Sequence, residues 1–309
     1  MAGVFSRRAS VAVAMHRTRL HVVPAERTDR GPVDPVDIGR VVVPVDGSPF
    51  AERALPVAVW AAHALGAEIH LIEVVSGARD TASAVRYLDG LTRRHAAWSG
   101  DVARGDDVGD TIVAATRGEP PGLACLATHG RDRRATVLGS TAIAVLDRAT
   151  DPVMLVGPQA RPPRAGDAPV VVAVDGAATD HALVDIARAW ATRLGNRLVI
   201  ATVAEPVPPS FREGQPLHRA RGPADPEGYV ADLAARAADA SCTVDTRVAY
   251  DPISVRDGLV RLVDRTAALL VVGSHRRTRP LRALFGSHTP RIVHDIEVPA
   301  LVVPLDAGT

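Results

Sequence analysis

The sequence predicts an α/β protein built from two tandem copies of one domain, each an open, parallel five-stranded sheet covered by helices. Two observations predict this fold class. Short apolar runs without polar alternation, such as 40–45, recur between helix-like stretches, as expected for strands buried on both faces of a parallel sheet. The run 170–176 then repeats the pattern of 41–47, and the later elements repeat in the same order. A length of 309 residues fits two domains of ~150 residues each.

The first copy begins with the strand at 40–45, after which Ser48, Pro49 and Glu52 mark a helix start. That helix is predicted to end at a C-cap glycine, Gly66. The rest of the copy alternates as strand 67–75, helix 81–95, strand 97–103, helix 108–117, strand 122–128, helix 139–149 and strand 151–156. Right-handed crossovers then place helices on both faces of the sheet.

Composition sets the domain boundaries. Residues 1–38 are predicted to be a disordered basic leader, in which translation can start at Met1 or Met15. The predicted domains are 39–158 and 169–305, with a proline- and arginine-rich linker at 159–168 and a proline-rich loop inserted at about 205–228.

Residue usage excludes several functions. All 36 basic residues are arginine, so neither a P-loop lysine nor a Schiff-base lysine is present. Cys125 and Cys242 lie in apolar, strand-like runs and are predicted to be buried, reduced thiols. A net charge of +1 gives no general attraction to nucleic acid or membrane, and no apolar run reaches the ~20 residues that span a bilayer. We therefore expect a cytoplasmic protein that binds neither nucleic acid nor membrane.

The candidate chemistry lies in the loop between the strand at 122–128 and the helix at 139–149. A helix N-terminus presents unpaired N–H groups and a positive dipole end, which favour an anion such as phosphate. The residues of this loop are Ala127, His129, Gly130, Arg131, Gly139, Ser140 and Thr141, and a second version contains Gly273, His275, Arg276, Gly286 and Ser287.

Several motifs together resemble the universal stress protein family in its tandem form. They are Val-Pro-Val-Asp-Gly-Ser at 43–48, Gly-Asp at 105–106, Thr-His-Gly-Arg at 128–131, Gly-Ser-Thr at 139–141 and Asp-Pro-Val-Met-Leu-Val at 151–156. The resemblance covers about 38–158 and 168–305. It implies a Rossmann-like sheet of strand order 3-2-1-4-5, similar to that of the adenine nucleotide alpha-hydrolases, and pairing of the two domains through their last strands. It also implies an ATP site near Val45, Val74 and Val174, and a homodimer of the whole chain.

Both loops depart from the G-x2-G-x9-G-[ST] pattern of the family's ATP-binding members. In the first copy Ala127 replaces the first glycine, and the gap from Gly130 to Gly139 is one residue short. In the second copy Gly273 and the gap are kept, but Arg276 replaces the second glycine. Glycines here allow positive φ and close approach of phosphate to the backbone, so both loops are altered versions of one motif.

The ligand of an open parallel sheet binds beyond the carboxyl ends of the strands, where the strand order reverses. Asp46 and Asp175 end the two first strands and would lie beside adenosine or a Mg²⁺ ion. Each candidate also has a structural interpretation. The Asp46 carboxylate can have a role in the turn alone. Ser140 and Ser287 can be helix N-caps without any ligand. His129 and His275 have no second catalytic residue at a recognisable spacing.

Three functions remain open from the sequence. The first is a stress-response or signalling protein that binds ATP, with Mg²⁺, in at least one domain with little or no turnover. The second is a tandem scaffold that no longer binds nucleotide and acts through dimerisation or a partner. The third is an enzyme on a related nucleotide fold, against which stands the lack of a catalytic lysine or a recognisable Ser-His-Asp motif.

Overall fold

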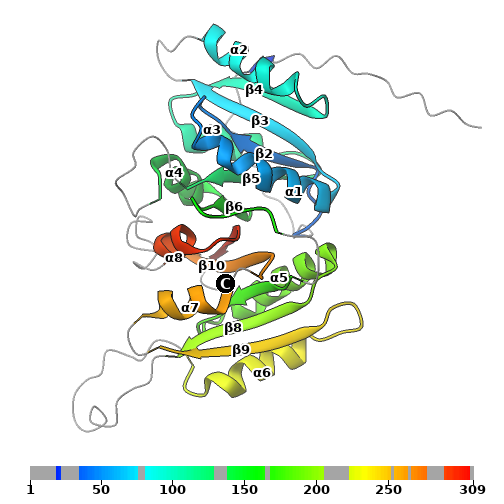
Figure 1. Ribbon diagram of the computed structural model, residues 1–309, viewed down its shortest axis with the longest axis vertical. Coiled ribbons are helices and arrows are strands. Elements are labelled where there is room, and N and C mark those ends of the chain that lie inside the picture. Colours follow the sequence, from blue (N-terminus) through cyan, green and yellow to red (C-terminus); the bar gives the residue numbers. More distant parts are fainter. Residues whose placement is uncertain are drawn as a thin grey trace, which may run out of the picture.

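The computed structural model describes residues 19–21, 35–75, 81–128, 138–163, 168–204, 223–251, 254–263, 266–276 and 289–306. It shows a long molecule in which two α/β halves follow one another along the longest axis (Figure 1). Each half alternates strands and helices, because each strand is a short apolar run that a helix must cover on either side.

The first half contains five strands of the predicted pattern: β2 Arg40–Pro44, β3 Glu68–Val75, β4 Trp98–Arg104, β5 Gly122–Ala127 and β6 Val153–Val156. Between them lie the 3-10 turn η1 Ala51–Ala54 and the helices α1 Leu55–Leu65, α2 Thr81–Thr92, α3 Val108–Ala115 and α4 Ser140–Arg148.

The second half repeats the series. Its strands are β7 Val170–Ala173, β8 Leu198–Ala204, β9 Val244–Tyr250, β10 Leu269–Arg276 and β11 Ala300–Asp306. Its helices are α5 Asp180–Leu194, α6 Pro226–Ala237, α7 Val255–Val263 and α8 Thr289–Asp295.

One continuous sheet joins the halves. With β1, Arg19–His21, its order is β1-β4-β3-β2-β5-β6-β11-β10-β7-β8-β9. Each half therefore has the predicted order 3-2-1-4-5. The two last strands, β6 and β11, pair antiparallel with Met154 opposite Leu301. This confirms the fold class and the predicted pairing through the last strands.

Two hydrophobic cores cover the two faces of the sheet. One packs under α1, α2, α5 and α6, and the other under α3, α4, α7 and α8 (Figure 1). Each core contains buried residues of both halves, so the halves share their interior. Cys125 and Cys242 are buried and unbridged, as predicted.

The N-terminal segment differs from the prediction. Within the leader expected to be disordered, Arg19–His21 forms β1 and pairs parallel with β4, and Ile38 packs against the core. The pairing of β1 uses backbone groups of the edge strand β4, which any sequence can supply. The boundaries of the leader and the linker stay predictions.

Two helix boundaries also differ. The helix predicted from Ser48 starts as the turn η1, and Ser48 Oγ accepts a hydrogen bond from the Ala51 N–H at 3.3 Å. The helix predicted to reach His95 ends at Thr92, whose hydroxyl bonds to the Leu88 carbonyl at 3.0 Å. His95 leaves the helix and stacks on Trp98.

The first helices of the two halves end alike. Gly66 and Gly195 have φ of 70° and 67°, the left-handed conformation that glycine adopts without strain, which confirms the C-cap at Gly66. The two helix ends also meet, because the Arg193 guanidinium on α5 donates a hydrogen bond to the Leu65 carbonyl at the end of α1.

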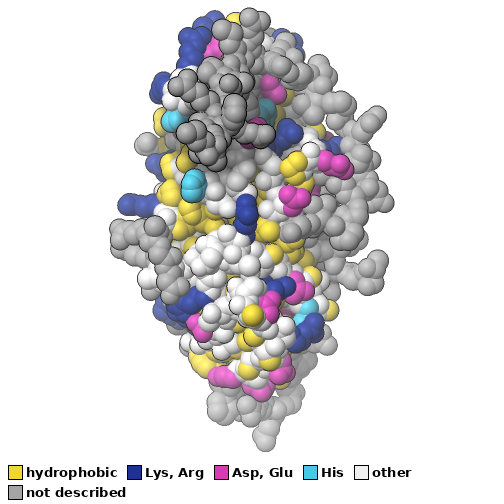
Figure 2. Space-filling view, turned by 90° about the vertical axis from the view of Figure 1, so that its right-hand side faces the viewer, with side chains coloured by type: hydrophobic (Ala, Val, Ile, Leu, Met, Phe, Trp, Pro, Cys, Tyr) yellow, Lys and Arg dark blue, Asp and Glu magenta, His cyan; other side chains and the backbone are white. Residues whose placement is uncertain are grey.

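On the face seen in Figure 2, arginine and acidic side chains of the described residues are interspersed with apolar ones. The net charge of the whole chain is +1. Among the helices of the described ranges, none is both long and apolar enough to cross a bilayer.

Because the cores are shared, we predict that both halves unfold in one transition and that Leu301→Ala lowers the free energy of unfolding by about 2–5 kcal/mol. Leu301 is fully buried beside the seam between β6 and β11. Urea unfolding followed by fluorescence, in variants that keep only Trp98 or only Trp190, reports on each half. Val59→Ala, at a side chain that is 42% exposed, should change stability by no more than about 0.5 kcal/mol. Two separate unfolding transitions, of which Leu301→Ala shifts only the one reported by Trp190, would contradict a shared core.

Candidate functional site

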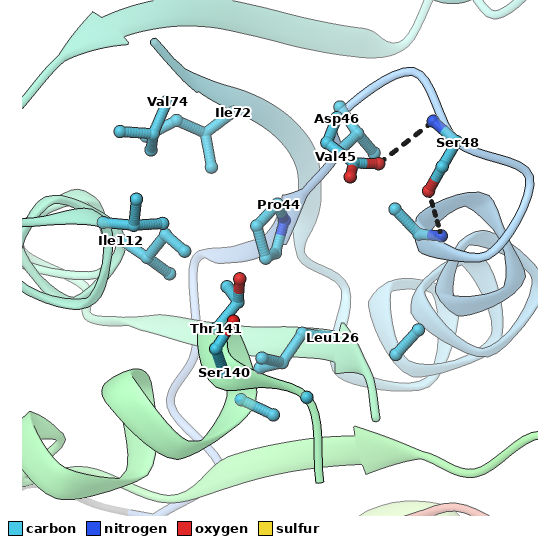
Figure 3. Close-up of a pocket in the computed structure, with 15 residues that line it drawn as sticks. Pro44, Val45, Asp46, Ser48, Ile72, Val74, Ile112, Leu126, Ser140 and Thr141 are labelled. Carbon is cyan, nitrogen blue, oxygen red and sulfur yellow. Dashed lines mark hydrogen bonds between the residues drawn. The ribbon is translucent and has the colours of Figure 1, made fainter. Parts of the chain in front are cut away.

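A cavity of about 210 Å³ opens at the carboxyl ends of β2 and β5 (Figure 3). These adjacent strands mark the point in the first half where the strand order reverses, which is where open parallel sheets bind ligands. The described residues that line the cavity are Pro44, Val45, Asp46, Ser48, Ala51, Ile72, Val74, Val108, Ile112, Leu126, Ala127, Gly139, Ser140, Thr141 and Ala142.

The cavity has an apolar wall and a polar rim. Ile72 and Val74 come from β3, Leu126 from β5 and Ile112 from α3, and they gather around Pro44 (Figure 3). Asp46 lies on one side, while the hydroxyls of Ser140 and Thr141 approach from α4 on another (Figure 3). Such a combination suits a ligand with a flat apolar part and a polar or anionic part.

Asp46 has a demonstrable structural role. One of its carboxylate oxygens accepts a hydrogen bond from the Ser48 N–H at 3.0 Å, across Gly47, whose φ is 75°. This is an Asx-type turn, and the left-handed Gly47 makes it possible. Asp46 therefore serves a turn, and the same turn holds its carboxylate at the rim of the cavity.

Helix α4 begins at the cavity without a side-chain cap. Gly139 is the N-cap residue, and its N–H bonds to the Thr128 carbonyl at 2.6 Å. Ser140 is the first helical residue, so the interpretation of Ser140 as an N-cap is wrong. The first-turn N–H groups of Ser140, Thr141 and Ala142 have no intrahelical acceptor, which is the arrangement that favours an anion.

The loop between β7 and α5, which corresponds to the Asp46 loop of the first half, ends at a buried carboxylate. The Asp180 side chain is only 2% exposed and accepts hydrogen bonds from the N–H groups of Asp175 and Gly176 at 3.1 and 2.9 Å. The Tyr229 hydroxyl donates to the same oxygen at 2.9 Å. Burial raises the pKa of the Asp180 carboxyl, and the Tyr229 hydrogen bond opposes that rise. The backbone donors after β7 are thus used internally.

Two glycines of the second half have close packing partners. Val203, which corresponds to Val74, is buried, and a Cβ on Gly258 of α7 would lie 2.6 Å from Val203 Cγ1. A Cβ on Gly273 would lie 2.7 Å from Leu305 Cδ1. The glycine at 273 therefore has a packing explanation that requires no phosphate.

A tyrosine on the second helix of each half bonds to an acid beyond the first strand. In the first half Tyr87 of α2 donates to Glu52 at 2.9 Å, as Tyr229 does to Asp180 in the second. Burial, followed by these hydrogen bonds, raises the pKa of both phenols. The pairs brace the loops that follow β2 and β7.

Comparisons with known proteins agree with this architecture. The universal stress protein family matches residues 38–97 and 168–304, more than half of the chain. The chain belongs to the universal stress protein family. A universal stress protein from Archaeoglobus fulgidus has 16% identity and a TM-score of 0.58, over 87% of this chain and 97% of that one. A functionally unknown protein from Pseudomonas aeruginosa has 18% identity and a TM-score of 0.56, over 87% and 94%. These two likenesses concern the fold, and no curated protein matches the chain.

The first universal stress protein domain gathers many of the predicted site residues in one place. Val45, Asp46, Val74, Ala127, Gly139, Ser140 and Thr141 all line the cavity. His129, Gly130 and Arg131 lie outside the described residues.

In the second domain Val174 is buried and Asp175 is exposed at the end of β7, and Gly273 lies in β10. Gly286 and Ser287 lie outside the described residues, and of His275 and Arg276 only the backbone is described. Arg276 is not in a loop turn as expected. Strand β10 continues to it and pairs it with Asp306, so its position requires no positive φ.

Several residues that line the cavity were not predicted from the sequence. Ile72 could have been found from Val74, because side chains two apart on a strand share a face. Val108 and Ile112 are four apart on a helix and likewise share a face. Pro44, Ser48, Ala51, Leu126 and Ala142 were also missed.

We predict that Asp180→Ala lowers the free energy of unfolding by about 1–3 kcal/mol, because it leaves two backbone N–H groups and the Tyr229 hydroxyl without their acceptor. Asp185→Ala removes an exposed carboxylate from the same helix and should change stability by no more than about 0.5 kcal/mol. Urea denaturation measures both. Equal effects of the two substitutions would show that Asp180 does not hold the loop.

Proposed function

We propose that this universal stress protein is a stress-response protein that binds ATP, with Mg²⁺, in its first domain and hydrolyses it slowly or not at all. The observation that carries the proposal is the cavity at the strand-order reversal, where an apolar wall faces the uncapped start of α4. An adenine ring suits the wall of Pro44, Ile72 and Val74, and phosphate suits the N–H groups of the helix start.

The volume of the cavity suits a group the size of a purine base. At about 210 Å³ it is smaller than the ~300–1,000 Å³ usual for drug-sized ligands, so it would take the adenine and leave the phosphates at the rim. Asp46 is the one ionisable side chain among the described lining residues. A single carboxylate matches a Mg²⁺ ion that arrives with phosphate oxygens, since Mg²⁺ keeps few protein ligands.

The same lining favours binding over catalysis. General acid–base chemistry needs a second ionisable group placed near the first, and the described part of the wall offers Asp46 alone. ATP would then act by stabilising one arrangement of the site and shifting the population of a partner-binding surface. We propose that the chain works in the cytoplasm as a homodimer.

A scaffold that does not bind nucleotide is the outcome that would overturn this proposal. In the first test the purified protein is denatured and the released nucleotides are separated by chromatography. Thermal unfolding is then followed with ATP and Mg²⁺, because ligand at 100 times its Kd adds about 2.7 kcal/mol. No nucleotide released and no stabilisation at millimolar ATP would leave the scaffold as the function.

We predict that Asp46→Ala weakens ATP binding about ten- to a hundredfold, while Asp175→Ala leaves it within about twofold. The first removes a charged hydrogen-bonding group worth about 1.5–3 kcal/mol at the cavity rim. The second removes the corresponding residue of the second domain, so it is the matched control. Calorimetric titration measures both affinities, and circular dichroism checks that each variant is folded. An unchanged affinity in Asp46→Ala with a loss in Asp175→Ala would move the site to the second domain.

A further inference from the structure

We propose that Arg148 is a positioning residue that fixes the spacing of α3 and α4 and thereby sets the nucleotide affinity of the first domain. Arg148 lies on the last turn of α4, at the opposite end of that helix from the cavity. The proposal rests on the proposed function, because it concerns the same site.

The Arg148 guanidinium joins both helices. Its Nη2 pairs with the Asp107 carboxylate, its Nε lies 3.0 Å from Asp110 Oδ1, and its Nη1 donates to the Ala144 carbonyl at 3.0 Å. Asp107 is the N-cap of α3 and accepts the Asp110 N–H at 2.9 Å. That backbone hydrogen bond is the largest cause that lowers the pKa of Asp107, and Arg148 lowers it further. One planar cation therefore binds the start of α3 and the last turns of α4.

A glycine completes the contact. A Cβ on Gly109 would lie 2.6 Å from the Ala144 carbonyl oxygen, so the backbones of α3 and α4 touch there. Val108, next to Gly109, and Ile112, one turn on, line the cavity from α3. Residues 139–142 line it from the first turn of α4, just before Ala144. The distance between α3 and α4 at Gly109 therefore affects the width of the cavity.

The second domain links its corresponding helices, α7 and α8, by a similar ion pair. There the arginine lies on the first of the two helices and the carboxylate on the second. When the two domains are aligned, Gly109 corresponds to Arg256 and Arg148 corresponds to Asp295, at the same sequence offset. Arg256 Nε donates to Asp295 Oδ2 at 2.6 Å, from α7 to α8. Because an arginine stands where α3 has Gly109, the backbones of α7 and α8 cannot touch at this point as those of α3 and α4 do. The close glycine contact is therefore a feature of the first domain, beside its cavity.

The test compares Arg148→Gln with Arg256→Gln, which removes the exchanged pair of the second domain. We expect Arg148→Gln to weaken ATP binding about tenfold and Arg256→Gln to change it less than twofold, although both lower the melting temperature. Arg148→Lys keeps the charge but not the fork that bridges two carboxylates, so it should recover only part of the affinity. Equal losses in Arg148→Gln and Arg256→Gln, or no loss in either, would overturn the proposal.

A measurement without nucleotide separates this proposal from the proposed function. Hydrogen–deuterium exchange of the peptide 138–146 should be at least about fivefold faster in Arg148→Gln than in wild type, and unchanged in Arg256→Gln. Unchanged exchange in Arg148→Gln would refute the positioning role, whatever the ATP result. If exchange is faster in Arg148→Gln but ATP does not stabilise the wild type, the nucleotide function is refuted. The role of Arg148 in fixing α3 against α4 would then still stand.

Discussion

The antiparallel pairing of β6 with β11 is the constraint on which the rest of the molecule depends. It turns two parallel half-sheets into one, and it makes both hydrophobic cores continuous across the seam. It also reverses strand direction, so the carboxyl ends of the strands lie at one edge in the first half and at the other edge in the second. The two clefts therefore cannot meet on a single ligand.

A seam of this kind leaves each half free to diverge. Strand pairing is made by backbone groups, and it requires only that buried side chains remain apolar. The first half keeps a cavity with an uncapped helix start. In the second half the Asp180 carboxylate accepts hydrogen bonds from the loop after β7, and Val203 packs beside Gly258. The two halves thus differ in the contacts around their loops although they share one topology.

Much of this could be predicted from the sequence, because local patterns carry it. The apolar runs predicted the strands, the internal repeat predicted the two halves, and Gly66 predicted the end of a helix. The gathering of Asp46 and Ser140 followed from the strand order, which the resemblance to the universal stress protein family implied. What failed depends on long-range contacts. Strand β1 pairs through its backbone, and the partners Arg148 and Asp107 lie 41 residues apart. Nothing in a local pattern shows that Gly258 faces Val203.

One contact across the seam acts on two helices at once. Arg193 belongs to the last turn of α5, and it donates to the final carbonyl of α1. The guanidinium places a positive charge at the end of α1, and its own residue lies in the last turn of α5. A cation at either position offsets the partial negative charge of a helix C-terminus. The electrostatics of the first helix in one half thus depend on a side chain supplied by the other, and that dependence would be lost if the halves were produced as separate chains.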